Sequence, residues 1–562
     1  HARGIALANA PWAKSSHLIE SDSVVGQVAL LPLLVGKVRL KALALEGVVV
    51  RLETSPRGEK SWELAGDKSS GPAALATDLP ELVEFSLRDA NISSDASTPW
   101  RLDEATIRCE SGLRDLRFEA SGSRGHHALK VKARFDDLSH IGVTGAMTTG
   151  HADFDWGDTQ LSIEGRVPLD GTTAGHAVRA DLKTPHLNDM LAFFGIARRP
   201  TAPIEAHVDS SESGGVIEAK DIRIKLGRFD LGGEAKVVPG DATSTIDAHL
   251  AGSRLDWPQA LLDMGDEPVP PRAPDELFYS RPLAWPLLVA LQGWRGNVDA
   301  TFAGVRMRSG IELRDLKTRS SFTGDHWNVN SYTAGMLGGT ASGSVQFEGR
   351  RKFAKLTLEG SDMLLERWYR ERGSPISFKG GPMKVSASVS GTGDSIRDLA
   401  QSMTGPVAIR MGRGLLDDAR AGAARAKLTG TGSPDGGIAF ECASANLPFH
   451  DGRAVRSPAV AAMSDASYLV TSGSVDLRSE TYDLHGRIKP RAAGKVSLST
   501  FVGDVVITGK MRHPHMTHDT SKTPAEIGRA GLAVATLGGS AIASSSAEAA
   551  AAGEKNPCEA VF

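Results

Sequence analysis

The sequence predicts a mainly β fold that is built from repeated antiparallel hairpins and contains a few short helices. Apolar and polar residues alternate with period two in many short segments, which is the pattern of strands with one buried and one solvated face. The chain of 562 residues also contains 61 glycines and only 6% aromatic residues. This composition suits short strands separated by turns better than long helices.

The first strands are expected in residues 31–53, LPLLVGKVRLKALALEGVVVRLE. The apolar residues of one strand face in this segment are Val38, Leu40, Val48, Val50 and Leu52. Between the two runs the alternation slips at Ala42 and Leu43. We therefore predict a bulge at that point, followed by a turn near Glu46 and Gly47.

The same hairpin plan returns further along the chain. It is found in LSIEGRVPLDGTTAGHAVRADLK from residue 161, LGGEAKVVPGDATSTIDAHL from 231, ASGSVQFEGRRKFAKLTLEG from 341 and TSGSVDLRSETYDLHGRIKP from 471. A lone hairpin is marginally stable in water, so these units must add edge to edge into an extended sheet. A second covering sheet would make a sandwich, but the irregular spacing of the repeats suits a long curled sheet at least as well.

Breaks in the pattern divide the chain into four regions. Residues 263–275 are rich in proline and acid and precede a short helix expected in RPLAWPLLVALQGW, so we predict strand-rich halves at 1–262 and 296–520, joined by a linker at 263–295. In the second half, Ser395 and Asp398 have the spacing of a capping box, which predicts a helix start. Residues 521–562 are rich in Ala, Gly and Ser and predict a weak apolar helix with a tail.

The composition argues against several classes of function. The formal charge is −3, from 64 basic and 67 acidic residues, which gives no reason to expect a nucleic-acid partner. No apolar run reaches the roughly 20 residues that cross a bilayer. Because the chain begins at His1, we expect a processed or truncated product whose targeting segment lies outside it.

No motif in the sequence predicts a metal site, a cofactor or a catalytic centre. DFDWGDTQLSIE from Asp153 has acids at the ends of a calcium loop, but Asp158 stands where the turn needs glycine. GDVVITGKM from Gly503 lacks the spacing of a phosphate loop. The histidines of HPHMTHD are more often solvated than ligating in such a polar segment. With no local nucleophile and base combination, we expect a protein that is not an enzyme.

Four segments together resemble the AsmA family of bacterial envelope proteins, in the order of that family. They are GIALANAPWA with LLPLLVGKVRLKALALEGVVVRLE and GEKSWEL, RPLAWPLLVALQGWRGNVDATFAGVRM with LGGTASGSVQF, GTGDSIRDLAQSMTGPVAIRMGRGLLDDA, and FECASANLPFHDGRA with GSVDLRSETYDLHGRIKP and NPCEAVF. The resemblance implies a periplasmic protein that is anchored in the inner membrane by an amino-terminal helix. That helix would precede the present chain.

The resemblance also implies a fold and an activity. The fold is a long curled antiparallel sheet whose open apolar groove carries phospholipid toward the outer membrane, where the protein would make a further contact. The period-two residues then line the groove: Val38, Leu40, Val48, Val50, Leu52, Leu161, Ile163, Val345, Phe347, Leu356, Leu358, Val475, Leu477, Val505 and Ile507. The weak helix after residue 521 is a candidate cover for this apolar surface, which would otherwise promote aggregation.

A second hypothesis is an envelope assembly factor that binds strands of outer-membrane proteins along an unpaired sheet edge. Both hypotheses place the chain in an oxidising compartment. Of the three cysteines, Cys442 and Cys558 lie in segments that resemble the family, FEC and NPC. The resemblance therefore implies a Cys442–Cys558 disulfide that ties the carboxy-terminal tail to the last module, whereas Cys109 stays free and buried.

Overall fold

The structure is a computed structural model, and it describes residues 1–29, 40–55, 58–62, 83–94, 97–110, 113–125, 127–185, 202–263, 273, 275–283, 285–289, 291–367, 377–417, 438–464, 467–490, 503–519 and 556–562. The chain divides into two compact units. The first consists of His1–Gly240 and Gln259–Asp266, and the second consists of Asp241–Pro258 and Glu267–Phe562. Strand residues 244–256 of the predicted amino-terminal half therefore belong to the second unit.

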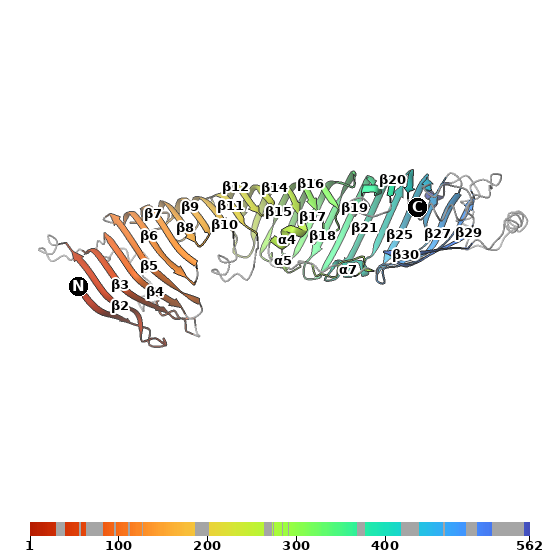
Figure 1. Ribbon diagram of the computed structural model, residues 1–562. Helices are drawn as coiled ribbons and strands as arrows, with labels where there is room; N and C mark the ends of the chain where they lie inside the picture. The colour runs from red at the N-terminus through yellow and green to blue at the C-terminus, as the bar shows by residue number, and fades with distance from the viewer. Residues whose placement is uncertain are drawn as a thin grey trace, which may run out of the picture. The chain divides into compact units, whose positions relative to one another are not determined.

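The first unit is a sheet in which the strands follow one another in chain order (Figure 1). Its strands are β1 (Ala2–Ala8), β2 (His17–Val28), β3 (Leu40–Leu52), β4 (Glu84–Ser94), β5 (Ser97–Glu110), β6 (Arg114–Arg124), β7 (His127–Asp137), β8 (Met147–Trp156), β9 (Thr159–Pro168), β10 (Ala177–Thr184), β11 (Ile204–Ser213), β12 (Val216–Leu226) and β13 (Phe229–Val238). The hairpin predicted from residue 161 is the antiparallel pair β9–β10.

The second unit repeats this plan. Its main sheet contains β14 (Ser244–Asp256), β15 (Trp294–Arg306), β16 (Glu312–Thr323), β17 (His326–Met336), β18 (Gly339–Glu348), β19 (Phe353–Leu364), β21 (Pro382–Thr392), β22 (Gly405–Met411), β25 (Cys442–His450), β26 (Arg453–Met463), β27 (Ser467–Asp476), β28 (Thr481–Pro490), β29 (Gly503–Lys510) and β30 (His513–Asp519). A small sheet pairs β20 (Ser377–Gly380), β23 (Gly414–Asp417) and β24 (Ile438–Phe440).

Short helices interrupt the strands, as the sequence predicts. They are α4 (Trp257–Asp263), α5 (Trp285–Val289), α7 (Ile396–Gln401) and α11 (Pro557–Ala560). The capping box predicted from Ser395 and Asp398 is present at the start of α7. The side chain of each residue accepts a hydrogen bond from the backbone N–H of the other. The helix predicted after residue 521 lies outside the described residues.

The sheets are mixed, whereas the sequence predicts purely antiparallel pairing. β3 pairs with β4 in parallel, and β14 pairs with β15 in parallel. In both places the connecting chain is long, residues 53–83 and 257–293. Parallel neighbours need a crossover of a dozen or more residues, which a hairpin turn cannot supply and these two connections can.

The turn predicted near Gly47 is also wrong, because β3 continues through this residue. Gly47 has a left-handed φ of +62°, and pairing with β2 holds on both sides of it, from Glu46 opposite Ser23 to Val48 opposite Ser21. Leu45 and Val48 therefore face the same side although they are three residues apart. The predicted bulge is present close to the expected place, because Leu40 and Ala42 are two residues apart on β3 but pair with the adjacent residues Val28 and Gln27 of β2.

Aspartate takes the same backbone role in other strands. Asp89, Asp221, Asp315 and Asp362 lie inside strands and have φ values between 47° and 55°. Around Asp221, Ala219 and Ile222 are three residues apart but pair with β13 residues only two apart. Aspartate tolerates the left-handed conformation better than most residues. A strand can therefore contain one residue more than its neighbour at this point, and its apolar side chains still project from the same face on both sides of the aspartate.

Candidate functional site

An unbroken row of apolar residues crosses the first unit from its first strand to its last. Each member is the direct cross-strand partner of the next, so all project from the same side of the sheet. The row consists of Ala2, Val24, Leu45, Leu87, Ala105, Ala120, Val131, Phe154, Leu161, Leu182, Ala206, Ile224 and Leu231. We call this side the apolar face of the first unit.

The predicted residues of the first unit that can be placed lie on this face. Val48 and Val50 follow Leu45 on β3, Leu52 continues the same alternation, and Ile163 pairs with Ala180 beside Leu161. Ile163 remains 39% exposed, so the face is open to solvent at that point. Leu40 begins β3, and Val38 lies outside the described residues.

Aromatic rings gather at one end of this face. Trp156 is buried, and its ring centroid lies 6.2 Å from that of Trp100 and 6.4 Å from that of Phe154. The guanidinium of Arg124 lies 4.9 Å from the centroid of the Trp100 ring, within the range of a cation–π contact. The rings therefore pack against one another where β5 begins and β8 ends.

The second unit has an apolar face of the same construction. Val345 pairs with Leu356, and Leu358 pairs with Ala387, which in turn pairs with Val407 on β22. Phe347 lies two residues from Val345 on the same side of β18. Further along, Ile507 pairs with Leu484, and Val505 lies two residues away on β29. These predicted residues therefore share one face of the second sheet.

Part of this second face is covered by the chain itself. Ala400 of α7 and Phe278 pack on a buried cluster that contains Phe449, Val475 and Leu477. Trp285 at the start of α5 is buried and meets Phe347 edge to face, with 6.1 Å between the ring centroids. We call residues 275–283 and α5, together with α7, the cover. Val475 and Leu477, predicted as groove lining, thus belong to a buried cluster. Two other predicted lining residues are covered as well, because Ile507 packs against this cluster and Val505 is only 1% exposed.

A buried carboxylate fixes the cover to the sheet. Glu480, in the turn between β27 and β28, is 6% exposed. It accepts a hydrogen bond from the backbone N–H of Leu277 and lies 3.7 Å from the guanidinium of Arg397 in α7. Arg397 also pairs with Glu276 at 2.8 Å. Backbone contacts of the 275–283 segment with α7 complete the attachment, including Arg397 N–H to Tyr279 O at 3.0 Å.

The expected disulfide between Cys442 and Cys558 is present, with 6.4 Å between the Cα atoms. It holds the carboxy-terminal peptide on β25 and β26. Val561 is fully buried, and its carbonyl accepts hydrogen bonds from Asn446 at 3.1 Å and Arg456 at 2.8 Å. Cys109 is buried and is not part of a disulfide, and burial raises the pKa of its thiol.

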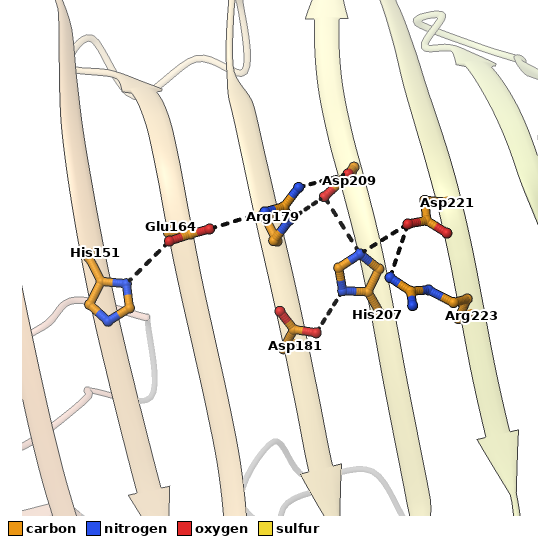
Figure 2. A network of polar contacts seen from close by, with 8 residues as sticks. All are labelled: His151, Glu164, Arg179, Asp181, His207, Asp209, Asp221 and Arg223. Atoms are coloured by element: carbon orange, nitrogen blue, oxygen red, sulfur yellow. Dashed lines mark hydrogen bonds and ion pairs between the residues drawn. The ribbon is translucent and has the colours of Figure 1, made fainter.

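The opposite side of the first sheet is charged, and we call it the charged face. The direct partners Glu84, Arg108, Arg117, Arg134, His151, Glu164, Arg179, Asp209 and Lys220 cross β4 to β12 in one row. Figure 2 shows part of this face, where Arg179 lies between Glu164 at 3.4 Å and Asp209 at 2.8 Å. The hydrogen bond from Arg179 lowers the pKa of Asp209.

A shallow hollow of about 740 Å³ lies over this charged row. Its lining includes Arg134, His151, Glu164, Arg179 and Asp209. No site was predicted in this region from the sequence. The alternation of polar and apolar residues could have indicated a charged face here. His207 and Asp209 alternate with apolar residues on one strand, and Asp181 does so on the strand before it.

Two of the rejected motifs form strands, as the sequence predicts, whereas HPHMTHD, expected as a polar segment after a strand, is itself a strand. Asp153 to Glu164 forms parts of β8 and β9, and the segment from Gly503 forms β29. The histidines of HPHMTHD lie in β30, where His515 is exposed. Among the described helices, none combines the length and the apolar character needed to cross a membrane.

Comparison with known proteins gives one family match. No curated protein and no solved structure matches the chain. The AsmA family model matches residues 1–207, which include β1 to β10 and the charged and apolar rows that cross them. This match covers residues 1–207 of the 562-residue chain and supports its membership in the AsmA family.

Proposed function

We propose that the protein carries phospholipid in the bacterial envelope by holding acyl chains against the apolar faces of its two units, and that it does so without catalysing a reaction. The unbroken apolar row of the first unit is the observation that supports this proposal most directly. Membership in the AsmA family, which is associated with the bacterial envelope, agrees with it. A periplasmic location and attachment to the inner membrane belong to the same proposal.

The physical basis is burial of apolar surface without specific contacts. Removing apolar surface from water contributes about 25 cal/mol per Å², or about 0.8 kcal/mol for each buried CH₂ group. A row of aliphatic side chains offers this gain at every strand, so an acyl chain can shift from one strand to the next at similar free energy. No pocket of fixed shape is needed, and the lipid headgroup can remain on the solvent side.

The test compares substitutions on the two faces of the same strand. In the first unit Leu161→Asp places a charge in the apolar row, whereas Gln160→Asp places it on the opposite, exposed side. Val345→Asp and Gln346→Asp form the matched pair in the second unit. Mass spectrometry of gently purified protein should detect phospholipid in wild type and in both Gln variants, and several-fold less in the Leu161 and Val345 variants.

Native protein that keeps its β circular dichroism but contains no phospholipid would contradict the proposal. Equal lipid content in the Leu161→Asp and Gln160→Asp variants would contradict lipid binding by the apolar face of the first unit.

A second candidate is binding of an outer-membrane protein strand at a sheet edge. It is favoured by β1, whose seven residues are all exposed and which pairs only with β2 among the described strands. Ile5→Pro would remove a backbone donor from this edge. If edge binding is the function, this change should abolish capture of an extended β-strand peptide, and Leu161→Asp should leave capture intact.

A further inference from the structure

Four side chains meet on the charged face where β10, β11 and β12 lie side by side. Asp181 comes from β10, His207 and Asp209 come from β11, and Asp221 comes from β12 (Figure 2). The His207 side chain is only 14% exposed. A histidine this deep among three carboxylates needs an explanation, because most histidines of the described strands lie at the solvent-exposed surface of the sheet.

The two ring nitrogens of His207 have different surroundings. Nδ1 lies 2.6 Å from Asp181 Oδ1, which is a short hydrogen bond. Because the carboxylate can only accept, Nδ1 carries a proton, and Nε2 is the ring nitrogen left to bind an ion. Nε2 is buried and has no hydrogen-bond partner in the structure. It faces Asp221 Oδ2 at 3.6 Å and Asp209 Oδ1 at 3.7 Å.

These separations are too long for hydrogen bonds but suit ligands of one ion. A hydrogen bond between nitrogen and oxygen spans about 2.7–3.2 Å. Two ligands that each lie about 2.1 Å from a tetrahedral metal ion are about 3.4 Å apart. The ligand atoms of His207, Asp209 and Asp221 all lie within 4.8 Å of one another, so modest side-chain movement would place them around one ion.

The excess of acidic side chains around His207 also favours binding of a cation. Arg179 pairs with Asp209, and Arg223 pairs with Asp221 at 3.0 Å. Asp181 and Glu164 add two further carboxylates to the same network. The four carboxylates of Asp181, Asp209, Asp221 and Glu164 outnumber the two guanidinium groups of Arg179 and Arg223. Each aspartate oxygen has two lone pairs, so it can keep its arginine and still coordinate an ion.

We propose that His207, Asp209 and Asp221 form a binding site for a divalent transition-metal ion of the Zn²⁺ type, with Asp181 as the positioning residue for the imidazole. Imidazole nitrogen and carboxylate oxygen are both ligands that Zn²⁺ accepts, and water would complete the coordination. A carboxylate on the other ring nitrogen is the usual partner of a metal-bound histidine. The ion would join β11 to β12 on the face opposite the apolar row.

Titration of the full chain with Zn²⁺ tests the site, with isothermal calorimetry as the readout. All arms use a background in which His513, His515 and His518 are replaced by alanine, since these neighbouring histidines of β30 could bind metal themselves. The background protein should bind one Zn²⁺, and His207→Ala or Asp221→Asn should abolish this event. Asp181→Asn should weaken it about 10- to 100-fold, as for other partners of metal-bound histidines.

His485→Ala is the matched control, because His485 contacts one aspartate, Asp483 at 2.9 Å, on an exposed strand position. It should leave Zn²⁺ binding unchanged. Circular dichroism separates loss of the site from loss of the fold. In addition, ¹⁵N spectra of the folded background protein should show Zn²⁺ shifting the Nε2 resonance of His207. Failure to bind Zn²⁺, or binding that leaves this resonance unmoved and survives His207→Ala, would overturn the proposal.

Discussion

Single residues with unusual backbone conformations keep the apolar rows continuous. Gly47 is the clearest case, because its φ of +62° lets Leu45 and Val48 face the same side. It also lies against Asp22, where a Cβ atom would come within 2.1 Å of Oδ2 and 2.6 Å of Cγ. Glycine is therefore required there for two reasons, its conformation and the close approach of a side chain.

Gly47→Ala should destabilise the first unit by more than about 1 kcal/mol, since the new Cβ adds a clash to the cost of a left-handed alanine. Gly171→Ala is the control, because Gly171 also has a positive φ of 77° but has nothing within 4 Å of the added atom. Urea unfolding of both variants measures the difference. Equal losses of stability would show that the contact with Asp22 contributes nothing.

A titration at one aspartate gives the second unit an acid-sensitive contribution. The hydrogen bond from Arg478 lowers the pKa of Asp476 to about 2, and the side chain is 21% exposed. Because the folded pKa lies below the ordinary value of 3.8, this stabilisation is complete above about pH 4 and is lost as the pH falls toward 2.

Asp476→Asn should therefore reduce the stability of the second unit at pH 6 and have little effect at pH 2. Asp483→Asn is suitable for comparison, since Asp483 is 64% exposed. Denaturant midpoints measured from pH 6 to pH 2 provide the test. A loss of stability in Asp476→Asn that is the same at both ends of this range would contradict the assignment.

At the level of elements, the cover depends on the first turn of α7. Ser395 is 1% exposed, and its hydroxyl accepts a hydrogen bond from the Asp398 N–H at 3.2 Å. The Asp398 carboxylate in turn accepts a hydrogen bond from the Ser395 N–H at 2.9 Å. A helix of six residues has little stability of its own, so this cap and the packing of Ala400 hold it on the sheet.

Ser395→Ala should lower the unfolding free energy of the second unit by about 1 kcal/mol, the usual cost of losing an N-cap side chain. Binding of an environment-sensitive fatty-acid probe should increase, because loosening α7 uncovers the apolar face. Ser342→Ala, at an exposed position of β18, serves as the control. Unchanged stability together with unchanged probe binding would show that the cap does not hold the cover.

Glu480 joins two elements of the cover through one buried carboxylate. Glu480→Gln keeps the shape of the side chain but removes the charge that faces Arg397 and weakens the acceptor for the Leu277 N–H. The expected cost is about 1–3 kcal/mol, the range for a hydrogen bond lost at a buried charged group. Thermal unfolding beside the exposed control Glu359→Gln measures it, and a midpoint equal to that of the control would contradict the role of Glu480.

At the scale of the whole molecule, a disulfide closes a long section of the second unit. Cys442 and Cys558 are 116 residues apart, and cross-linking a loop of this length restricts the unfolded chain by about 4.7 kcal/mol in the chain-entropy model. Engineered and native bridges commonly contribute less, in the range of about 2–5 kcal/mol. The first unit contains no disulfide among its described residues.

Replacing Cys442 and Cys558 together by alanine should thus lower the unfolding midpoint of the second unit and leave that of the first unit unchanged. Hydrogen exchange followed by mass spectrometry can report the two units separately. Cys109→Ala is the control for the loss of a thiol as such. An equal decrease of protection in both units would show that the effect of the disulfide is not confined to the carboxy-terminal module.

Local patterns in the sequence are enough to predict the type of fold and the chemistry of the two faces. Period-two alternation is a local property, so Val345 and Phe347 could be assigned to one side of a strand without knowledge of its neighbours. The hairpin partners β9 and β10 could be paired for the same reason, because a short turn brings adjacent strands together. The capping box of α7 was also predictable, since Ser395 and Asp398 are three residues apart.

Contacts between residues far apart in the chain could not be predicted in this way. The parallel pairs β3–β4 and β14–β15 follow from long connections, whose path alternation does not specify. The cover puts Phe278 and Ala400 on a cluster with Val475, over a separation that no local pattern spans. The meeting of Asp181, His207 and Asp221 likewise depends on the register of three strands, because a shift of one residue in any of them would turn its side chain to the apolar face.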